Sequence, residues 1–408
     1  MMQFHLRFRK LYAIIIGVVF FVAGMLKLLD PVGTGLIVEE YLKFFHLGFM
    51  IPAAKTLGVA LSLLESLTGA ALITRSYKKI SAVSASALVL LFSVVSLVLW
   101  VANPPMDCGC FGEAIHLTHF QTLFKNIILL VLCFGAFLPF NHFKADKAHK
   151  LVSFWIMAAT LVFMTFYSLR HIPIMDFTPY TLSARLYEAA KEDMDGEEEY
   201  VTTFVYEKNG QKGVFTIDNL PDSTWTYVSS KTMRKEDNLK ETKFPVLSFT
   251  DAESNICDSV AIRKDVMIVS VYDPSKLDIK GWDKTAGILE RASAAGFTQV
   301  LLTACTPDEF ARLLPEGLDA ERRATLLEST YYADYKELIS LNRANGGATW
   351  FHNGNLIEKW SANNLPESNT LEKIIRSNST STMLKASTKG RLAFQALFLY
   401  SFAVMILI

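Results

Sequence analysis

The chain has no excess of either charge. Its 408 residues contain 40 Lys and Arg and 40 Asp and Glu, so the formal net charge is zero. A protein that follows a phosphate backbone carries a basic field, and the absence of one argues against nucleic acid as a partner. The charges are also unevenly distributed. Apolar runs dominate up to about residue 170, whereas residues 171–388 have the composition of an ordinary soluble protein.

Long apolar runs with almost no charge fill the first part of the chain. A transmembrane helix needs about 20 predominantly apolar residues, and five runs can supply it. A sixth run at residues 392–408 is at the lower limit, so it either spans the membrane or lies along its interface. The sequence therefore predicts an integral membrane protein that has the lipid bilayer as a partner. The five runs are residues 11–29, 50–74, 80–102, 120–140 and 151–169.

The first run lacks a clear small-x-small cleavage site, so we interpret it as a retained span rather than a signal peptide. Basic residues then orient the chain, because Lys and Arg gather in cytoplasmic loops. The basic segments share one side, which predicts a bacterial inner membrane protein with a cytoplasmic N-terminus. The third connection and everything after Leu169 are then extracytoplasmic. The basic segments contain Arg7, Arg9, Lys10, Arg75, Lys78, Lys79, Lys144, Lys147 and Lys150.

Two cysteines lie one residue apart in the third connection, where residues 107–112 read Asp-Cys-Gly-Cys-Phe-Gly. Disulfides persist outside the cytoplasm, and Gly109 lets the backbone close a strained, readily exchanged ring. Cys108 and Cys110 are thus a candidate redox pair, a structural pair, or two thiolate ligands of a soft metal ion for which no further ligands are evident. His116 and His119 are minor candidates, because loop histidines are usually solvated or capped.

A carboxylate lies inside the second run. A charge at the bilayer centre costs about 2.5–3.5 kcal/mol or more, so Glu65 should face the bundle interior beside a partner. Lys27 and Lys125 lie toward the outer ends of their runs, and either could approach Glu65 or snorkel to the interface. These three residues predict a polar pocket in the membrane. Its role could be proton handling, ligand binding or only a structural hydrogen bond.

The soluble part is predicted to fold in two pieces. Residues 171–240 form a small β-rich segment with a hairpin turn at Asn209-Gly210. Residues 241–380 alternate strands and helices, and the order βαβα followed by a β-hairpin and a helix resembles the thioredoxin fold. The predicted strands are residues 266–272, 299–303, 348–352 and 356–360, and the predicted helices are residues 281–296, 308–314, 332–344 and 367–376.

This α/β domain lacks the CxxC that thioredoxins carry after the first core strand. The corresponding residues 272–276 read Tyr-Asp-Pro-Ser-Lys, and Gly346-Gly347 stand where a cis-proline would precede the hairpin. Exchange chemistry needs a thiolate nucleophile, so we interpret the domain as a non-redox binding or scaffolding module. Cys257 and Cys305 fit buried small hydrophobes, with a disulfide or a reactive thiol as alternatives.

The membrane part resembles the DoxX/MauE group of four-helix membrane proteins over residues 8–140. The resemblance is carried by the Cys-Gly-Cys-Phe-Gly loop between the third and fourth spans, and by residues 21–27, 30–33, 39–41, Leu64-Glu65 and Lys125-Asn126. The MauE branch implies a role in methylamine utilisation, in which it supports disulfide formation or maturation of a periplasmic enzyme subunit. The fused thioredoxin-like domain and the extra spans depart from that pattern and look more like the fused DoxX proteins of Bacteroidota.

Together these patterns predict a membrane all-α four-helix bundle plus extra transmembrane helices, with a soluble extracytoplasmic α/β thioredoxin-like domain. One hypothesis is extracytoplasmic thiol–disulfide chemistry at Cys108 and Cys110, which a lipid-soluble quinone would reset; no other cofactor and no metal are evident. The alternative is a non-enzymatic membrane scaffold that binds an unidentified periplasmic protein. The expected divisions are residues 1–142 (bundle), 143–170 (fifth span), 171–240 (β-rich segment), 241–380 (thioredoxin-like domain) and 390–408 (C-terminal helix).

Overall fold

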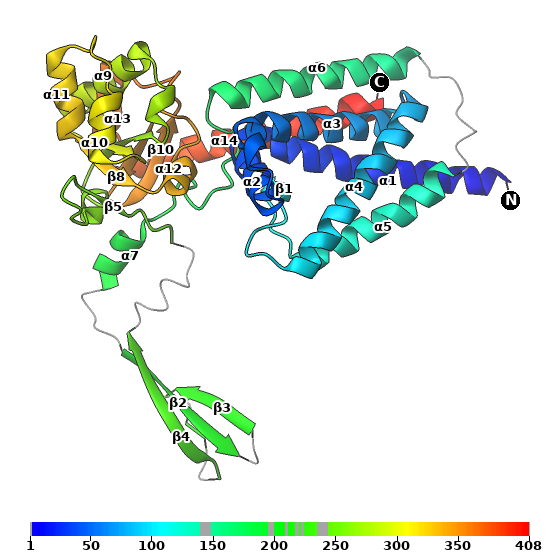
Figure 1. Ribbon diagram of the computed structural model, residues 1–408, viewed down its shortest axis with the longest axis horizontal. Coiled ribbons are helices and arrows are strands. Elements are labelled where there is room, and N and C mark those ends of the chain that lie inside the picture. The colour runs from blue at the N-terminus through cyan, green and yellow to red at the C-terminus, as the bar shows by residue number, and fades with distance from the viewer. Residues whose placement is uncertain are drawn as a thin grey trace. The chain divides into compact units, whose positions relative to one another are not determined.

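The computed structural model separates the chain into two compact units. The membrane unit comprises Met1–Phe177 and Ser387–Ile408, and the α/β unit comprises Thr178–Ala386 (Figure 1). The predicted turn at Asn209-Gly210 and the basic residues Lys144 and Lys147 lie outside the described residues. The structure describes residues 2–138, 148–194, 200–208, 211–216, 220–221, 224–234 and 244–407.

Six helices in the described chain are long and apolar enough to cross a membrane. The C-terminal helix is longer than its apolar run because it begins at Ser379, so its length no longer limits spanning. Two short helices, α2 (Pro31–Phe44) and the 3₁₀ helix Gly48–Ala53, connect the first two spans. The six helices are α1 (Met2–Leu29), α3 (Ala54–Thr74), α4 (Lys78–Ala102), α5 (His119–Phe137), α6 (Ala148–Arg170) and α14 (Ser379–Leu407).

Helix α1 contributes to both apolar cores of the membrane unit. Ile16 and Phe20 belong to a cluster with side chains of α4 and α5. Phe21 and Met25 belong to a second cluster with α6 and Met405 of α14. Figure 1 shows α14 lying along the bundle, and the Ser153 hydroxyl of α6 donates a 2.7 Å hydrogen bond to the carbonyl of Val404. The extra helices therefore pack on the predicted bundle.

Small residues bring α1 and α3 into backbone contact. A Cβ added at Gly24 would lie 2.6 Å from the carbonyl oxygen of Ser62, and one added at Gly69 would lie 2.4 Å from the backbone nitrogen of Phe21. Close approach through small residues is how helices associate in lipid, where packing replaces the hydrophobic effect. This contact fixes the position of α1 along the axis of α3, and it thereby brings Lys27 opposite Glu65.

The α/β unit contains a six-stranded sheet in the order β10-β9-β6-β7-β8-β5. Strands β6, β7 and β8 are parallel, whereas β9, β10 and β5 run antiparallel to their neighbours. The strands are β5 (Phe249–Thr250), β6 (Val266–Val271), β7 (Thr298–Thr303), β8 (Thr330–Ala333), β9 (Gly347–His352) and β10 (Asn355–Trp360). The helices are α9 (Ile279–Ala295), α10 (Pro307–Leu313), α11 (Ala320–Glu328), α12 (Tyr335–Leu341) and α13 (Ser368–Arg376).

Both faces of this sheet are buried, which explains why strand β6 is apolar at every position except Ser270. Met267 and Val269 of β6 join the core that contains Trp282 of α9. Ile268 points into the opposite core, with Leu338 of α12. Successive side chains of a strand point to opposite faces, so a strand covered on both sides is expected to be almost continuously hydrophobic.

Most predicted α/β elements are confirmed, and one is wrong. The hairpin of β9 and β10 turns at Asn353 and Gly354, which both have positive φ (49° and 70°), as its two-residue turn requires. The predicted helix over residues 332–344 is wrong at its start, because β8 pairs with β7 up to Tyr332. Helix α12 begins only after Asp334, whose carboxylate accepts hydrogen bonds from the first turn. The prediction also missed α11, β5 and β8.

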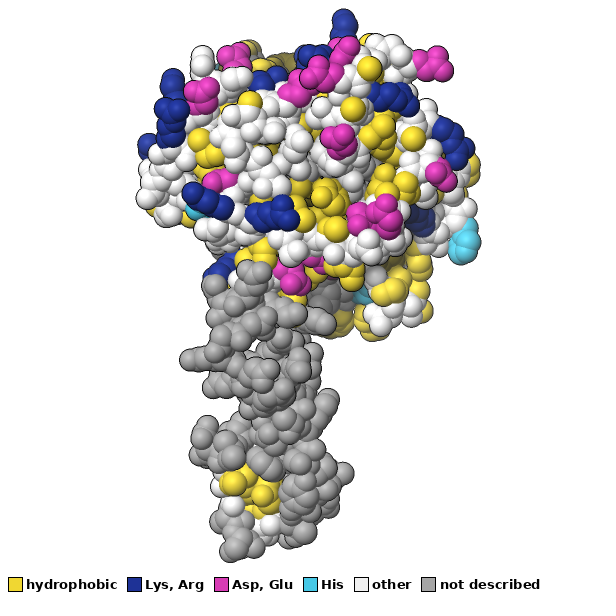
Figure 2. Space-filling model, turned by 90° about the vertical axis from the view of Figure 1, so that its left-hand side faces the viewer, with side chains coloured by type: hydrophobic (Ala, Val, Ile, Leu, Met, Phe, Trp, Pro, Cys, Tyr) yellow, Lys and Arg dark blue, Asp and Glu magenta, His cyan; other side chains and the backbone are white. Residues whose placement is uncertain are grey.

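The predicted β-rich segment contains a separate three-stranded antiparallel sheet, β3-β2-β4. Its strands are β2 (Tyr200–Lys208), β3 (Gln211–Thr216) and β4 (Thr226–Arg234), and helix α7 (Tyr187–Met194) precedes them. Leu186, at the start of this region, instead packs into the core of the six-stranded sheet. Figure 2 shows acidic and basic side chains interspersed over the visible face of the α/β unit, as the neutral composition implies.

The contact of α1 with α3 can be tested with one methyl group. We expect Gly24→Ala to lower the free energy of unfolding by about 1–3 kcal/mol, because the added Cβ overlaps backbone atoms of α3 that cannot move easily. Denaturant unfolding of the detergent-solubilised protein measures the change. Gly48→Ala is the control, since nothing lies within 4 Å of its Cβ. Equal stability of the two variants would contradict this packing.

Candidate functional site

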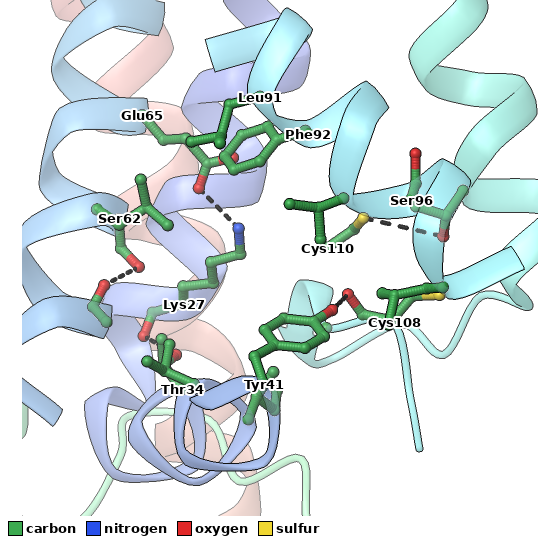
Figure 3. A pocket seen from close by; sticks show the side chains of 18 of the residues that line it. Lys27, Thr34, Tyr41, Ser62, Glu65, Leu91, Phe92, Ser96, Cys108 and Cys110 are labelled. Atoms are coloured by element: carbon green, nitrogen blue, oxygen red, sulfur yellow. Dashed lines mark hydrogen bonds and ion pairs between the residues drawn. The ribbon is translucent and has the colours of Figure 1, made fainter. Parts of the chain in front are cut away.

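A cavity of about 170 Å³ lies inside the membrane unit. Its walls come from α1, α2, α3, α4 and α5 and from the loop between α4 and α5, and they are mainly apolar. All five residues singled out from the sequence, namely Lys27, Glu65, Cys108, Cys110 and Lys125, line this cavity. Figure 3 shows Lys27 and Glu65 at one side of it and the two cysteines at the other. The structure thus brings the cysteine pair and the polar pocket together in one site.

Lys27 and Glu65 form an ion pair, with 2.7 Å between Nζ and Oε2. Lys27 is 8% exposed and Glu65 is 3% exposed. The Lys27 ammonium also lies 5.6 Å from the centre of the Phe92 ring, within range of a cation–π contact. Thr34 donates a hydrogen bond to the carbonyl of Lys27, which holds the end of α1 against α2. Lys27 therefore points inward and does not snorkel.

Lys125 lines the same cavity. In the described part of the chain, Glu65 forms its ion pair with Lys27 and not with Lys125. The Lys125 ammonium lies 5.3 Å from the centre of the Phe111 ring. Phe111 directly follows the cysteine pair in the sequence. Asn126, which follows Lys125, donates hydrogen bonds to the carbonyl of Phe92 and the hydroxyl of Ser96. These bonds attach α5 to α4 at the level of the cavity. Of the two lysines that the sequence offered, only Lys27 neutralises Glu65.

The cysteine loop is anchored by α2. The Tyr41 hydroxyl donates a hydrogen bond to the carbonyl of Cys108, and burial raises the pKa of this hydroxyl, so it stays a donor. Gly109 has a φ of +54°, and a Cβ there would lie 2.4 Å from a methyl group of Ile37. Glycine is thus required both for the left-handed conformation and for the close approach. Cys108 is buried, at 4% exposure, whereas Cys110 is partly exposed.

Both thiols lie near the start of α5, and all five cysteines are free. The Sγ of Cys108 lies 2.9 Å from Nδ1 of His119, and the thiol of Cys110 donates a long hydrogen bond of 3.9 Å to the Thr122 hydroxyl. Burial raises the pKa of the Cys108 thiol. His119 was only a minor candidate from the sequence. Its position as the first residue of α5, after the Thr118 cap, is the signal that could have singled it out.

His116 lies apart from the thiols. Its Nδ1 is 2.9 Å from the Asp107 carboxylate, and both side chains are more than half exposed. Among the described residues, no group of three or more His, Cys, Asp or Glu side chains could hold a metal ion.

The segment after β6, where the predicted thioredoxin-like fold would have a CxxC, contains no thiol. That position contains a 3₁₀ turn (Pro274–Lys276), and the Asn345 side chain bonds both backbone groups of Asp273. Burial opposes ionisation of Asp273, but hydrogen bonds from Lys276 and Ser275 prevail and lower its pKa. Cys305 lies beyond β7, 3.5 Å from the Thr303 hydroxyl, and burial raises the pKa of its thiol.

Comparison with known proteins gives two matches. Residues 7–139 match the family described as methylamine utilisation protein MauE, which confirms the MauE part of the resemblance and covers every residue that lines the cavity. Residues 200–236 match a domain family of unknown function, DUF8463. No curated protein and no solved structure shows significant similarity. The N-terminal part of the chain is therefore similar to the MauE family, which is consistent with an integral membrane protein.

The buried ion pair predicts an asymmetry between single and double substitution. We expect Lys27→Met to lower the free energy of unfolding by about 3–5 kcal/mol, because it leaves the Glu65 carboxylate buried without a partner. The double variant K27M/E65L should recover most of this loss, because it removes both charges. Denaturant unfolding in detergent gives the values. Lys43→Met is the control, since its ion pair with Glu39 is exposed and should contribute at most about 1 kcal/mol.

Proposed function

We propose that the membrane unit transfers electron pairs between the dithiol of an extracytoplasmic protein and a lipid-soluble quinone, with Cys108 and Cys110 as the redox pair. The observation that carries the proposal is that both thiols line a mainly apolar cavity within helices long enough to span a bilayer. Such a cavity suits a planar apolar ring, and its polar groups are few and convergent. Tyr41 and Lys27 contribute a hydroxyl and an ammonium to this lining.

The reaction balances in two stages. A quinone in the cavity takes two electrons and two protons from Cys108 and Cys110, which leaves a quinol and the Cys108–Cys110 disulfide. A partner thiolate then attacks Sγ of Cys110, forms a mixed disulfide and releases Cys108. The partner's second thiol then attacks the partner's first sulfur, which is bonded to Cys110, and so frees Cys110. The partner dithiol and the quinone thus give a partner disulfide and a quinol.

Exposure assigns different tasks to the two thiols. Cys110 is partly exposed and therefore open to a protein partner, whereas Cys108 is buried against α5 and faces the cavity. The Lys and Arg distribution supports a position of this loop on the extracytoplasmic side of a bacterial inner membrane, where partner proteins acquire disulfides. A maturation role of the methylamine-utilisation type rests on the MauE family resemblance alone.

The α/β unit would serve as the module that binds the partner. Its parallel β6-α9-β7 unit followed by the β9-β10 hairpin and α13 supports the proposal that this domain is thioredoxin-like. Because Asp273 and the turn after it replace the thiols, this domain would hold a periplasmic protein without exchanging disulfides with it. The same observation favours the second candidate, a non-enzymatic membrane scaffold in which Cys108 and Cys110 are structural.

Trapping of mixed disulfides separates the two candidates. We expect Cys108→Ala to accumulate a covalent adduct through Cys110, which forms in the reverse direction when the Cys110 thiolate attacks a partner disulfide. Without Cys108 the neighbouring thiol can no longer release Cys110 from this adduct, so only the partner's second thiol can resolve it. Cys110→Ala should accumulate at least about tenfold less, because Cys108 is buried. Non-reducing gels and mass spectrometry of the adducts measure both. The C108A/C110A double variant is the control. If both single variants form no more adduct than this control, the result would favour the non-enzymatic scaffold.

Sidedness can be tested at a natural cysteine of the α/β unit. A membrane-impermeant maleimide applied to intact spheroplasts should label Cys257, which is partly exposed. Cys133, buried on α5, should stay unlabelled and serves as the internal control. Mass spectrometry of peptides gives the labelled fraction at each site. Labelling of Cys257 only after permeabilisation would place the α/β unit in the cytoplasm and overturn the proposed orientation.

A further inference from the structure

The histidine beside the buried thiol has its tautomer set by the backbone. Nε2 of His119 lies 3.0 Å from the carbonyl oxygen of Pro104. A carbonyl oxygen can only accept, so Nε2 carries a proton and donates it to Pro104. In the neutral imidazole the other nitrogen, Nδ1, is then a bare acceptor. This acceptor lies 2.9 Å from Sγ of Cys108, which donates its thiol proton to it.

We propose that His119 is the catalytic acid and base of Cys108, so that Cys108 is the thiol that exchanges electrons with the acceptor in the cavity and Cys110 is the thiol that exchanges with protein. The identity of that acceptor rests on the proposed function, but the proton transfer does not. A nucleophilic thiol with a base in hydrogen-bond contact, itself oriented by a third group, is the arrangement that activates cysteine in covalent catalysis. Here Cys108 is the nucleophilic thiol, His119 is the base, and the Pro104 carbonyl is the group that orients the base.

The environment of Cys108 explains why a base is needed. The thiolate, rather than the thiol, is the reactive form, and burial in this loop keeps the thiol protonated. The charged and titratable groups around it do not supply a dominant counter-charge. Asp107 and Cys110 of the loop and Tyr41 of α2 disfavour its anion, while Thr122 and Lys125 of α5 favour it. A base in direct contact removes this obstacle.

The proton steps balance with the electron steps. When Cys108 gives up its electrons, its proton moves from Sγ to Nδ1 of His119, which becomes an imidazolium and then passes this proton to the reduced acceptor. When Cys108 is later released from the Cys108–Cys110 disulfide as a thiolate, His119 delivers to Sγ the proton that the partner's attacking thiol gave up. His119 thus serves as base in one half of the cycle and as acid in the other, and it ends the cycle unchanged.

His116 offers a matched control in the same loop. It has the same side chain three residues earlier, but its Nδ1 bonds the exposed Asp107 carboxylate and not a thiol. Asparagine is a suitable replacement at both positions, since its amide keeps a polar side chain but has no basic nitrogen. The comparison of H119N with H116N therefore isolates the base from the general effects of changing the loop.

The test measures the reaction of Cys108 with methyl methanethiosulfonate, a small uncharged thiol reagent, in the full-length chain carrying Cys110→Ala. We expect H119N to slow this reaction at neutral pH by about 100-fold, the lower end of what a positioned base contributes. Its rate should recover as the pH is raised, because the thiol, whose pKa burial raises, must then ionise unaided. H116N should react like the parent. Mass spectrometry quantifies modification at Cys108 and, as an internal reference, at Cys257.

A thermal unfolding curve of each variant shows whether H119N is folded. The proposal is overturned if Cys108 reacts equally fast in H119N and the parent, if H116N slows it as much as H119N, or if the parent Cys108 is no more reactive at neutral pH than Cys257. These outcomes are independent of adduct trapping. If adducts form but H119N does not slow the reaction of Cys108, the proposed thiol exchange is retained and only the role of His119 as a base is refuted.

Discussion

A charged pair inside a helical bundle must be satisfied by the protein, because the bilayer core supplies neither water nor counter-ions. The Lys27–Glu65 ion pair meets this requirement across α1 and α3, and it does so because Gly24 and Gly69 let the two backbones touch. The cavity extends from this ion pair to the cysteine loop. The position of the ion pair in the wall of the cavity therefore depends on the contact between α1 and α3.

The cysteine loop shows how one residue can separate two thiols. Gly109 adopts a left-handed conformation under Ile37, and the chain on its two sides directs Cys108 to His119 and Cys110 toward Thr122. Both contacts are on the first turn of α5, yet only one places a basic nitrogen beside sulfur. The pair is thus chemically asymmetric. The Cys108 thiol is buried and contacts a proton acceptor, whereas the Cys110 thiol is more exposed.

The α/β unit could be predicted in outline because its signals are local. Mainly apolar strands such as β6, the Asn353-Gly354 turn and the Gly296 stop of α9 each depend on neighbouring residues. The prediction failed at residues 330–333, where helical spacing and strand pairing competed. Pairing of β8 with β7 decided the outcome, and that pairing joins residues about thirty positions apart in the chain, which no local pattern reports.

For the membrane unit, the sequence alone determined the number of apolar runs, the burial of Glu65 and the position of two thiols in a connecting loop, because hydropathy and charge act locally. Only the tertiary structure decided that Lys27 rather than Lys125 neutralises Glu65, and that Pro104 and Cys108 meet opposite nitrogens of His119. These choices depend on how helices rotate and at what height they pack. Side-chain contacts over a few ångströms set both, and such contacts join residues that are distant in the chain.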